Sequence, residues 1–469
     1  MIQHIARKEM RDLLRDGRFR WTAALVGALL VVSLGAGWLQ VSQARAQHEA
    51  AEATARDHWE DQGDKNPHSA AHYGIYAFKP RLPLSFVDQG VDPYTGTSVW
   101  LEAHRQNDFV LRAAQDATAS QRFAAITAAG VLQHLIPLLI ILLTFGALAT
   151  EREQGTMRQV LALGVDRRQL TWGKALGTAG ALSLLLIPAA ILGSAAVVIT
   201  GGGDLGPTLA RGAVLAATYT AYFGVFLALS LAVSAWAPSA RTALVILLGI
   251  WTVNGLVAPR VAVDVSKTLH PTPSAFEFAR TVEKEMSEGV GELQPPDRTA
   301  IAAQLMEEYG VDTVEELPVN FSGIALQESE KFGDKIFDRN YTALWDTFER
   351  QNRVHELLAV LAPGLAVRSL SMGLAGTDVE QHRHFAEAAE TYRRSLMEAM
   401  NMDLAYNSRT GETYLADEEL WESQEPFDYD APSLAWVLGN RALSLLVLGL
   451  WLIGAAVVAV RGVRRMEVS

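Results

Sequence analysis

The stretch "VLQHLIPLLIILLTFGALAT", Val131–Thr150, runs directly into "EREQGTMRQVLALGVDRRQLTWGK", Glu151–Lys174. The first part contains no Asp, Glu, Lys or Arg, whereas the second contains eight charged residues. A helix of about 20 residues rises about 30 Å, which is the thickness of the hydrocarbon core of a bilayer. We therefore interpret residues 131–150 as a transmembrane helix and residues 151–174 as the connector that follows it.

Five more apolar runs organise the rest of the chain. Overall, 49% of the residues are hydrophobic and 20% are charged, but the charges are segregated away from these runs. Buried core helices are rarely so long and so uniformly apolar. The sequence therefore predicts an all-α membrane protein with six transmembrane helices. The five further runs are residues 21–40, 175–200, 211–236, 242–258 and 437–460.

The first apolar run follows a basic start, a pattern that also describes a signal peptide. The tripeptide ARA at residues 44–46 resembles a cleavage site. However, the basic region and the apolar run are each longer than the corresponding parts of a signal peptide. We expect a retained membrane anchor.

The distribution of Lys and Arg predicts the orientation of the chain. The connectors on one side carry 15 basic and 7 acidic residues, although the whole chain has a net charge of −12. Short positive connectors stay in the cytoplasm, so we expect both termini there, in a bacterial inner membrane. The acidic remainder forms a solvated exterior and gives no indication of a nucleic-acid partner. The cytoplasmic parts are residues 1–20, 151–174, 237–241 and 461–469, and the periplasmic parts are residues 41–130 and 259–436.

The periplasmic segments are predicted to be mainly helical and to pack together as one domain. Ser274–Glu277 (SAFE) has the pattern of a capping box, in which a hydroxyl and a carboxylate satisfy backbone amides at a helix start. A second helix is expected between "PPD" and Gly310, and long helices within residues 324–361 and 378–404. The first segment should begin as a helix that continues the first span. It should then pass through a Pro- and Gly-rich loop, residues 66–96, and return as a helix into the second span.

A seventh apolar stretch, Glu356–Gly376, competes with the count of six. It contains Pro363 and Arg368, and a crossing here would move the C-terminal arginines to the outside. We expect a helix end and an apolar loop, buried in the periplasmic domain or dipping into the membrane interface.

Some kinds of chemistry are excluded by what the sequence lacks. The chain has no cysteine, which rules out disulfides and thiolate sites. It also contains no G-x-x-x-x-G-K-[ST] phosphate-binding loop. No Ser-His-Asp or paired-carboxylate pattern indicates catalysis, so we do not expect an enzyme.

The connector resembles a known signature. Its sequence is similar to the E-x-E-x-G-T…L…R…GK pattern after the second span of type-2 ABC-exporter permeases, although Val165 stands where such permeases often have proline. His72–Asn107 resembles a subfamily whose large periplasmic domain is split between two segments. The signature falls on Glu151, Glu153, Gly155, Thr156, Leu161, Arg167, Arg168 and Lys174.

The resemblance implies a coupling mechanism. In such permeases the connector is a coupling helix that docks on a separate ABC ATPase, which binds ATP and Mg²⁺. Two copies of the chain and two ATPase subunits would form the transporter. The composition alone also fits an ordinary solvated loop. The coupling interface would consist of Glu151, Arg152, Glu153, Gly155, Thr156, Arg158, Arg167, Arg168 and Lys174.

An amphipathic N-terminal helix is a further feature of the family. Here its basic side chains would face water and its apolar face would lie against lipid headgroups. The basic residues are Arg7, Lys8, Arg11 and Arg15, and the apolar ones are Ile2, Ile5, Ala6, Met10 and Leu13.

The transported substrate is less defined. Polar groups within the spans either line a path or join helices to one another, and the lack of intramembrane charge favours an amphiphilic, natural-product-like cargo over an ion. One alternative is mechanotransmission to a periplasmic partner, including maturation of a metal site, without transbilayer cargo. Another is a membrane-anchored sensor or scaffold without an ATPase. The intramembrane polar residues are Tyr219, Tyr222, Ser230, Ser234, Thr252 and Asn254.

Histidines in the periplasmic segments raise the question of a metal. His68 and His72 have the i, i+4 spacing that holds Zn²⁺ or Cu²⁺ on a helix face, and His382 and His384 form a second pair. No third ligand is marked near the first pair, and Pro67 and Gly74 restrict a helix there. We therefore predict no metal site.

Overall fold

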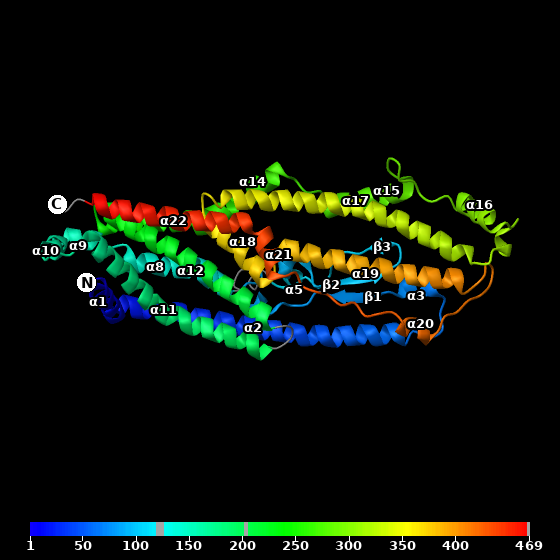
Figure 1. The fold of residues 1–469 in the computed structure, drawn as a ribbon, viewed down its shortest axis with the longest axis horizontal. Helices are drawn as coiled ribbons and strands as arrows, with labels where there is room; N and C mark the ends of the chain where they lie inside the picture. The colour runs from blue at the N-terminus through cyan, green and yellow to red at the C-terminus, as the bar shows by residue number, and fades with distance from the viewer. Residues whose placement is uncertain (119–125, 201–204, 467–469) are drawn as a thin grey trace.

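The computed structural model describes residues 1–118, 126–200 and 205–466. Within these ranges it has six helices that are long and apolar enough to cross a membrane. This confirms the prediction of an all-α, multi-pass membrane protein. Both termini lie at one end of an elongated molecule, and a large extramembrane domain forms the other end (Figure 1).

Two of the six candidate spans are interrupted, and a third begins directly after a break in the helix. The second span consists of α7, the π-helical segment η2, α8, a turn and α9. The fifth span consists of α13, the π-helical segment η3 and α14. The sixth span follows a break at Arg441. The elements of the spans are α2 (Gly17–Glu60), α7 (Ala128–Gly130), η2 (Val131–Leu135), α8 (Ile136–Thr144), α9 (Ala149–Glu153), α11 (Arg167–Thr200), α12 (Leu205–Trp236), α13 (Ala240–Thr252), η3 (Val253–Val257), α14 (Ala258–Leu269) and α22 (Ala442–Arg465).

Helix α2 links the membrane part to the extramembrane domain. As predicted, it continues beyond the first span, and its 44 residues correspond to about 66 Å of helix. Figure 1 shows it running from the end with the termini to the far part of the domain. The membrane part itself packs around α12, where Tyr222, Val225 and Phe226 are almost fully buried.

The extramembrane domain is built on an antiparallel pair of long helices, α17 and α19. Its hydrophobic core joins α2, α3, the sheet, α19 and α20 through Trp59, Trp421 and Phe385. The capping box at Ser274 is present, and Gly310 ends α16 in a left-handed conformation, so both helix signals are confirmed. The helices are α3 (Pro67–Tyr73), α4 (Asp92–Thr95), α5 (Ala113–Asp116), α15 (Ala275–Glu288), α16 (Arg298–Tyr309), α17 (Phe321–Leu358), α18 (Pro363–Ala375), α19 (Val379–Tyr406), α20 (Glu418–Glu422) and α21 (Leu434–Asn440), with short 3-10 turns η1 (Pro83–Phe86) and η4 (Val314–Glu316).

One part of the first extramembrane segment differs from expectation. The predicted return helix is wrong for residues 98–106, which form β2 (Ser98–Glu102) and β3 (Arg105–Gln106) beside β1 (Ile75–Phe78) in an antiparallel sheet. The buried side chains of Val99 and Leu101 alternate with the half-buried Trp100, which is the two-residue period of a strand. The predicted loop at residues 66–96 likewise contains α3, β1, η1 and α4.

The apolar stretch at Glu356–Gly376 is not a loop. Thirteen of its residues form α18, which packs on α12 and α22 within the same hydrophobic core as the spans. A helix of this length rises only about 20 Å, too short to cross a bilayer. Pro363 occupies its first turn, where the missing amide costs no hydrogen bond.

The N-terminal helix α1 (Ile2–Arg15) packs on protein rather than only on lipid. Ile5 and Met10 lie against α11 at Gly173 and Gly180, where an added Cβ would come within 2.5 Å of Ile5 and 3.0 Å of Met10. The expectation that the apolar face meets lipid headgroups is corrected to this extent, because a row of glycines on α11 provides a groove for it.

Candidate coupling loop and membrane cavity

The connector after the second span forms a short helix that projects beyond the spans. Helix α10 (Thr156–Ala162) lies at the same end of the molecule as both termini (Figure 1). The start of the connector is not one continuous helix, because the helix is broken between α9 and α10 at Gly155, whose φ of 71° is left-handed and favours glycine. This turn redirects the chain from α9 into α10.

Charged residues of the connector hold it against the neighbouring helices through ion pairs and hydrogen bonds. Lys174 Nζ lies 2.7 Å from Glu151 Oε1 and 3.1 Å from Glu9 Oε2, so one buried ammonium joins α11, α9 and α1. Arg152 donates to the carbonyl of Ala235 at 2.7 Å and also to that of Ala237, at the end of α12.

Three further hydrogen bonds hold the connector in place. Glu153 accepts a hydrogen bond from the backbone amide of Ala240 at 3.1 Å, at the start of α13. Thr156 donates to the carbonyl of Glu151 at 3.1 Å, and Arg167 donates to the carbonyl of Met466 at 2.8 Å. Six of the nine predicted interface residues therefore bind within the chain: Glu151, Arg152, Glu153, Thr156, Arg167 and Lys174.

The surface left for a partner is smaller than the sequence suggested. Arg158 and Arg168 are exposed, and Gly155 has open space where a Cβ would stand. Leu163, which was not predicted, is 82% exposed at the end of α10. The signal for it was an apolar residue next to Gly164 inside a charged connector.

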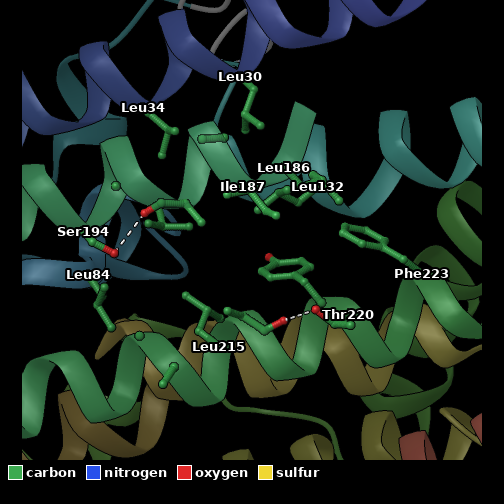
Figure 2. Close-up of a pocket in the computed structure, with 18 of the residues that line it drawn as sticks. Leu30, Leu34, Leu84, Leu132, Leu186, Ile187, Ser194, Leu215, Thr220 and Phe223 are labelled. Carbon is green, nitrogen blue, oxygen red and sulfur yellow. Dashed lines mark hydrogen bonds between the residues drawn. The ribbon is translucent and has the colours of Figure 1, made fainter. Parts of the chain in front are cut away.

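A large apolar cavity opens between α2, α11 and α12. Its volume is about 760 Å³, and Leu30, Leu186, Leu215 and Phe223 lie around it in Figure 2. Ser194 and Thr220 are among its few polar residues. Small residues on the two facing helices create the space, namely Ala189, Ala190, Gly193, Gly212, Ala213 and Ala216. The cavity suits an acyl chain or another elongated apolar group.

Most intramembrane polar residues join helices instead of lining this cavity. Tyr222 donates to the carbonyl of Gln133 at 3.0 Å and accepts from Asn254 at 2.9 Å, while Asn254 also accepts from the amide of Gly364. Ser234 accepts from the amides of Leu148 and Ala149.

The other three candidates behave differently from one another. Tyr219 borders the cavity, although its hydroxyl is bonded to Ser371 at 2.8 Å. Ser230 is buried within the protein, and Thr252 lies on the exposed side of α13. The helix-joining interpretation therefore fits Tyr222, Asn254 and Ser234, and also Tyr219, which borders the cavity as well. Ser230 and Thr252 support neither interpretation.

A buried arginine connects the last span to the extramembrane domain. Arg441, at the break between α21 and α22, contacts three carboxylates. These are Glu356 on α17, Asp378 before α19 and Glu380 on α19. A displacement of α22 would therefore act directly on both long helices of the domain.

The prediction of no metal site rested on the lack of a third ligand near His68 and His72, and that premise is wrong. A third imidazole, His104, lies beside His68 and His72 because the β2–β3 turn folds over α3.

This architecture defines a multi-pass membrane protein with a large extramembrane domain, a braced connector and an apolar cavity within the membrane part. A domain family of unknown function, DUF3526, matches residues 275–430, which contain α15 to α20. No curated protein matches the chain.

Proposed function

We propose that the chain is the membrane subunit of an ATP-driven type-2 ABC exporter. It would act as a homodimer, with each copy binding a separate ABC ATPase through α10. Both termini and α10 would be cytoplasmic in a bacterial inner membrane, and the extramembrane domain would be periplasmic.

The observation that carries this proposal is the rigid support of a projecting helix. A helix that receives force from a partner must pass it to the spans without bending. Bonds from Lys174, Arg152 and Glu153 tie the root of α10 to α1, α11, α12 and α13. Arg158 and Leu163 remain exposed beyond that root for contact with the ATPase.

The cavity supports an amphiphilic substrate. Its walls come from α11 and α12, which follow the connector directly in the chain, so movement of α10 would alter its shape. Ser194 and Thr220 donate their protons to carbonyls of their own helices, so their oxygens would accept a hydrogen bond from a polar group of a substrate, whereas most of the wall favours apolar carbon.

Mechanotransmission remains the second candidate because of two features. Helix α2 is continuous from the membrane part into the domain, and Arg441 binds α22 to both long helices. Together they would deliver motion of the spans to a periplasmic partner.

Co-purification tests the shared part of both proposals. The chain is isolated in mild detergent from its native membranes, and associated P-loop ATPase and ATP hydrolysis are measured. We expect Arg158→Glu/Leu163→Asp to remove both, whereas the matched change Arg280→Glu/Leu415→Asp, at exposed sites of the extramembrane domain, leaves them intact. Wild-type levels of ATPase with the first variant would refute the coupling role of α10.

Orientation has its own test, since the chain has no native cysteine. In cells with a permeabilised outer membrane, an impermeant maleimide should label Leu415→Cys but not Leu163→Cys. Labelling of Leu163→Cys before the inner membrane is opened would overturn the proposed sidedness.

A further inference from the structure

Three histidines meet on the extramembrane domain, away from the proposed coupling loop and the cavity. His68 and His72 come from α3, and His104 comes from the β2–β3 turn. One potential ligand atom from each lies within 4.8 Å of those from the other two. The ring centroids are 4.7 to 5.1 Å apart.

Several local features bring these side chains together. Asn66 caps α3 by accepting from the amide of His68 at 3.0 Å, and Pro67 occupies the first turn. Gly74 ends the helix with a φ of 62°, and an added Cβ would lie 2.5 Å from the carbonyl oxygen of Leu101. The amide of Ala103 donates to the carbonyl of Ala71 at 3.0 Å, which fixes the β2–β3 turn over the helix.

His104 is held in an orientation suited to a ligand. Its Nδ1 lies 2.6 Å from Oε1 of the buried Glu330, and its backbone amide donates to the same oxygen at 2.8 Å. With its proton on Nδ1, the ring presents the lone pair of Nε2. A carboxylate behind a histidine is the usual support of a metal-bound imidazole.

The same residue also has an unusual backbone. The φ of His104 is 65°, a left-handed conformation that few residues other than glycine adopt. Such strain persists only where the surrounding contacts impose it, and it is concentrated at functional sites. Here the two bonds to Glu330 hold it, and Glu330 is itself paired with the buried Arg393 at 3.3 Å.

We propose that His68, His72 and His104 bind one divalent transition-metal ion, Zn²⁺ or Cu²⁺, with Glu330 positioning His104. Imidazole nitrogen is a preferred ligand of both ions. Zn–N bonds of about 2.0–2.1 Å place ligand nitrogens roughly 3.3 Å apart, which side-chain rotation achieves from the present separations. His72 is exposed, so water or a group from a partner completes the coordination. The ion would join α3 to the β2–β3 turn within the first extramembrane segment, and the contact of His104 with Glu330 connects that turn to α17 of the second.

Metal binding by the full-length chain tests this site. The protein is purified in detergent through a tag without histidine, stripped with EDTA, and dialysed against ZnCl₂ or CuCl₂. We expect one ion per chain. His72→Ala should weaken binding by on the order of 100-fold, and since this side chain is exposed its loss leaves the fold intact. His58→Ala, an exposed histidine of α2, should bind like the wild type.

Glu330→Gln distinguishes a positioning role from a ligand. Affinity should fall about 10–100-fold, while electron paramagnetic resonance of the Cu²⁺ form still reports three nitrogen ligands. The absence of saturable binding by the wild type, or equal binding by wild type and His72→Ala, would overturn the site. Neither result depends on an ATPase, so the site and the proposed transport function stand or fall separately.

Discussion

Arg441 Nη2 lies 2.6 Å from Asp378 Oδ2 at the point where α22 enters the extramembrane domain. Only 3% of the arginine is exposed, and Glu356 and Glu380 also contact it. One guanidinium therefore contacts three carboxylates, which come from α17 and from the start of α19. The pair fixes the domain on the last span by charge as well as by packing.

Removal of this arginine should be severe. Arg441→Met leaves three neighbouring carboxylates without their cation, and breaking a buried pair in this way costs about 3–5 kcal/mol. Thermal unfolding in detergent should show a large drop in the transition temperature. Arg383→Met is the matched control, because Arg383 and Glu387 form a surface pair worth about 0–1 kcal/mol. Equal transition temperatures for the two variants would contradict the role of Arg441.

The packing of α1 against the glycines of α11 gives a second prediction. A Cβ at Gly177 would lie 2.6 Å from Glu9 Cβ and 2.8 Å from the carbonyl oxygen of Ala6, whereas one at Gly193, on the same helix, meets nothing within 4 Å. Gly177→Ala should therefore displace α1 and destabilise the protein by about 1–3 kcal/mol. Gly193→Ala should be neutral or stabilising by up to about 1 kcal/mol, because alanine favours helix.

Limited proteolysis within α1, with thermal unfolding, measures both changes. Faster cleavage in Gly177→Ala but not in Gly193→Ala is the expected result. If α1 is equally protected in both, it does not depend on the glycine groove.

The spans were predictable because each is a continuous run of apolar residues, a local property. Their ends were predictable only in part: the continuation of α2 beyond the first span was expected, whereas the helical continuation of the fifth span into α14, where polar residues replace apolar ones, was not. α18 was missed because an apolar stretch of 13 residues has the same composition as a buried loop. Burial against α12 and α22, which only the tertiary fold supplies, makes it a helix in the core.

The coupling loop was predictable only in part, because its position is set by the local sequence whereas its contacts are not. The position of the connector follows from the order of the spans, but the pairing of Lys174 with Glu9 joins residues far apart in the chain. Because of such pairings, residues that were predicted to contact a partner bind within the chain instead. His104 was missed because a hairpin, not helical spacing, brings it to His68 and His72.

The cavity predicts a selective effect of bulk on ligand binding. Ala213 borders the cavity, while Ala217, one turn further along α12, does not. Ala213→Trp should fill part of the roughly 760 Å³ and reduce the amphiphile that co-purifies with the chain. Native mass spectrometry measures the bound mass, and Ala217→Trp should retain it. Equal retention by both variants would place the amphiphile elsewhere on the protein.

Acid sensitivity should depend on His382. Burial, with the nearby charges of Lys79 and Arg112, lowers the pKa of His382 to about 3, and Phe109 and Trp345 pack against its ring. The unfolded chain takes up a proton near pH 6.5, whereas the folded chain does not. The stability present above pH 6.5 is therefore lost as the pH falls toward 3, by about 2 kcal/mol at pH 5.

His382→Gln has no proton to gain, so its transition temperature should fall less between pH 7.5 and pH 5 than that of the wild type. His58→Gln, at an exposed site, should fall as much as the wild type. EDTA in all samples keeps metal at His68, His72 and His104 from contributing. Burial lowers the pKa of His68 to about 4, and this effect is common to all three proteins. An unchanged pH dependence in His382→Gln would mean that this imidazole is reached by protons in the folded state, and that the packing of α19 against Phe109 and α17 opens in acid before the protein unfolds.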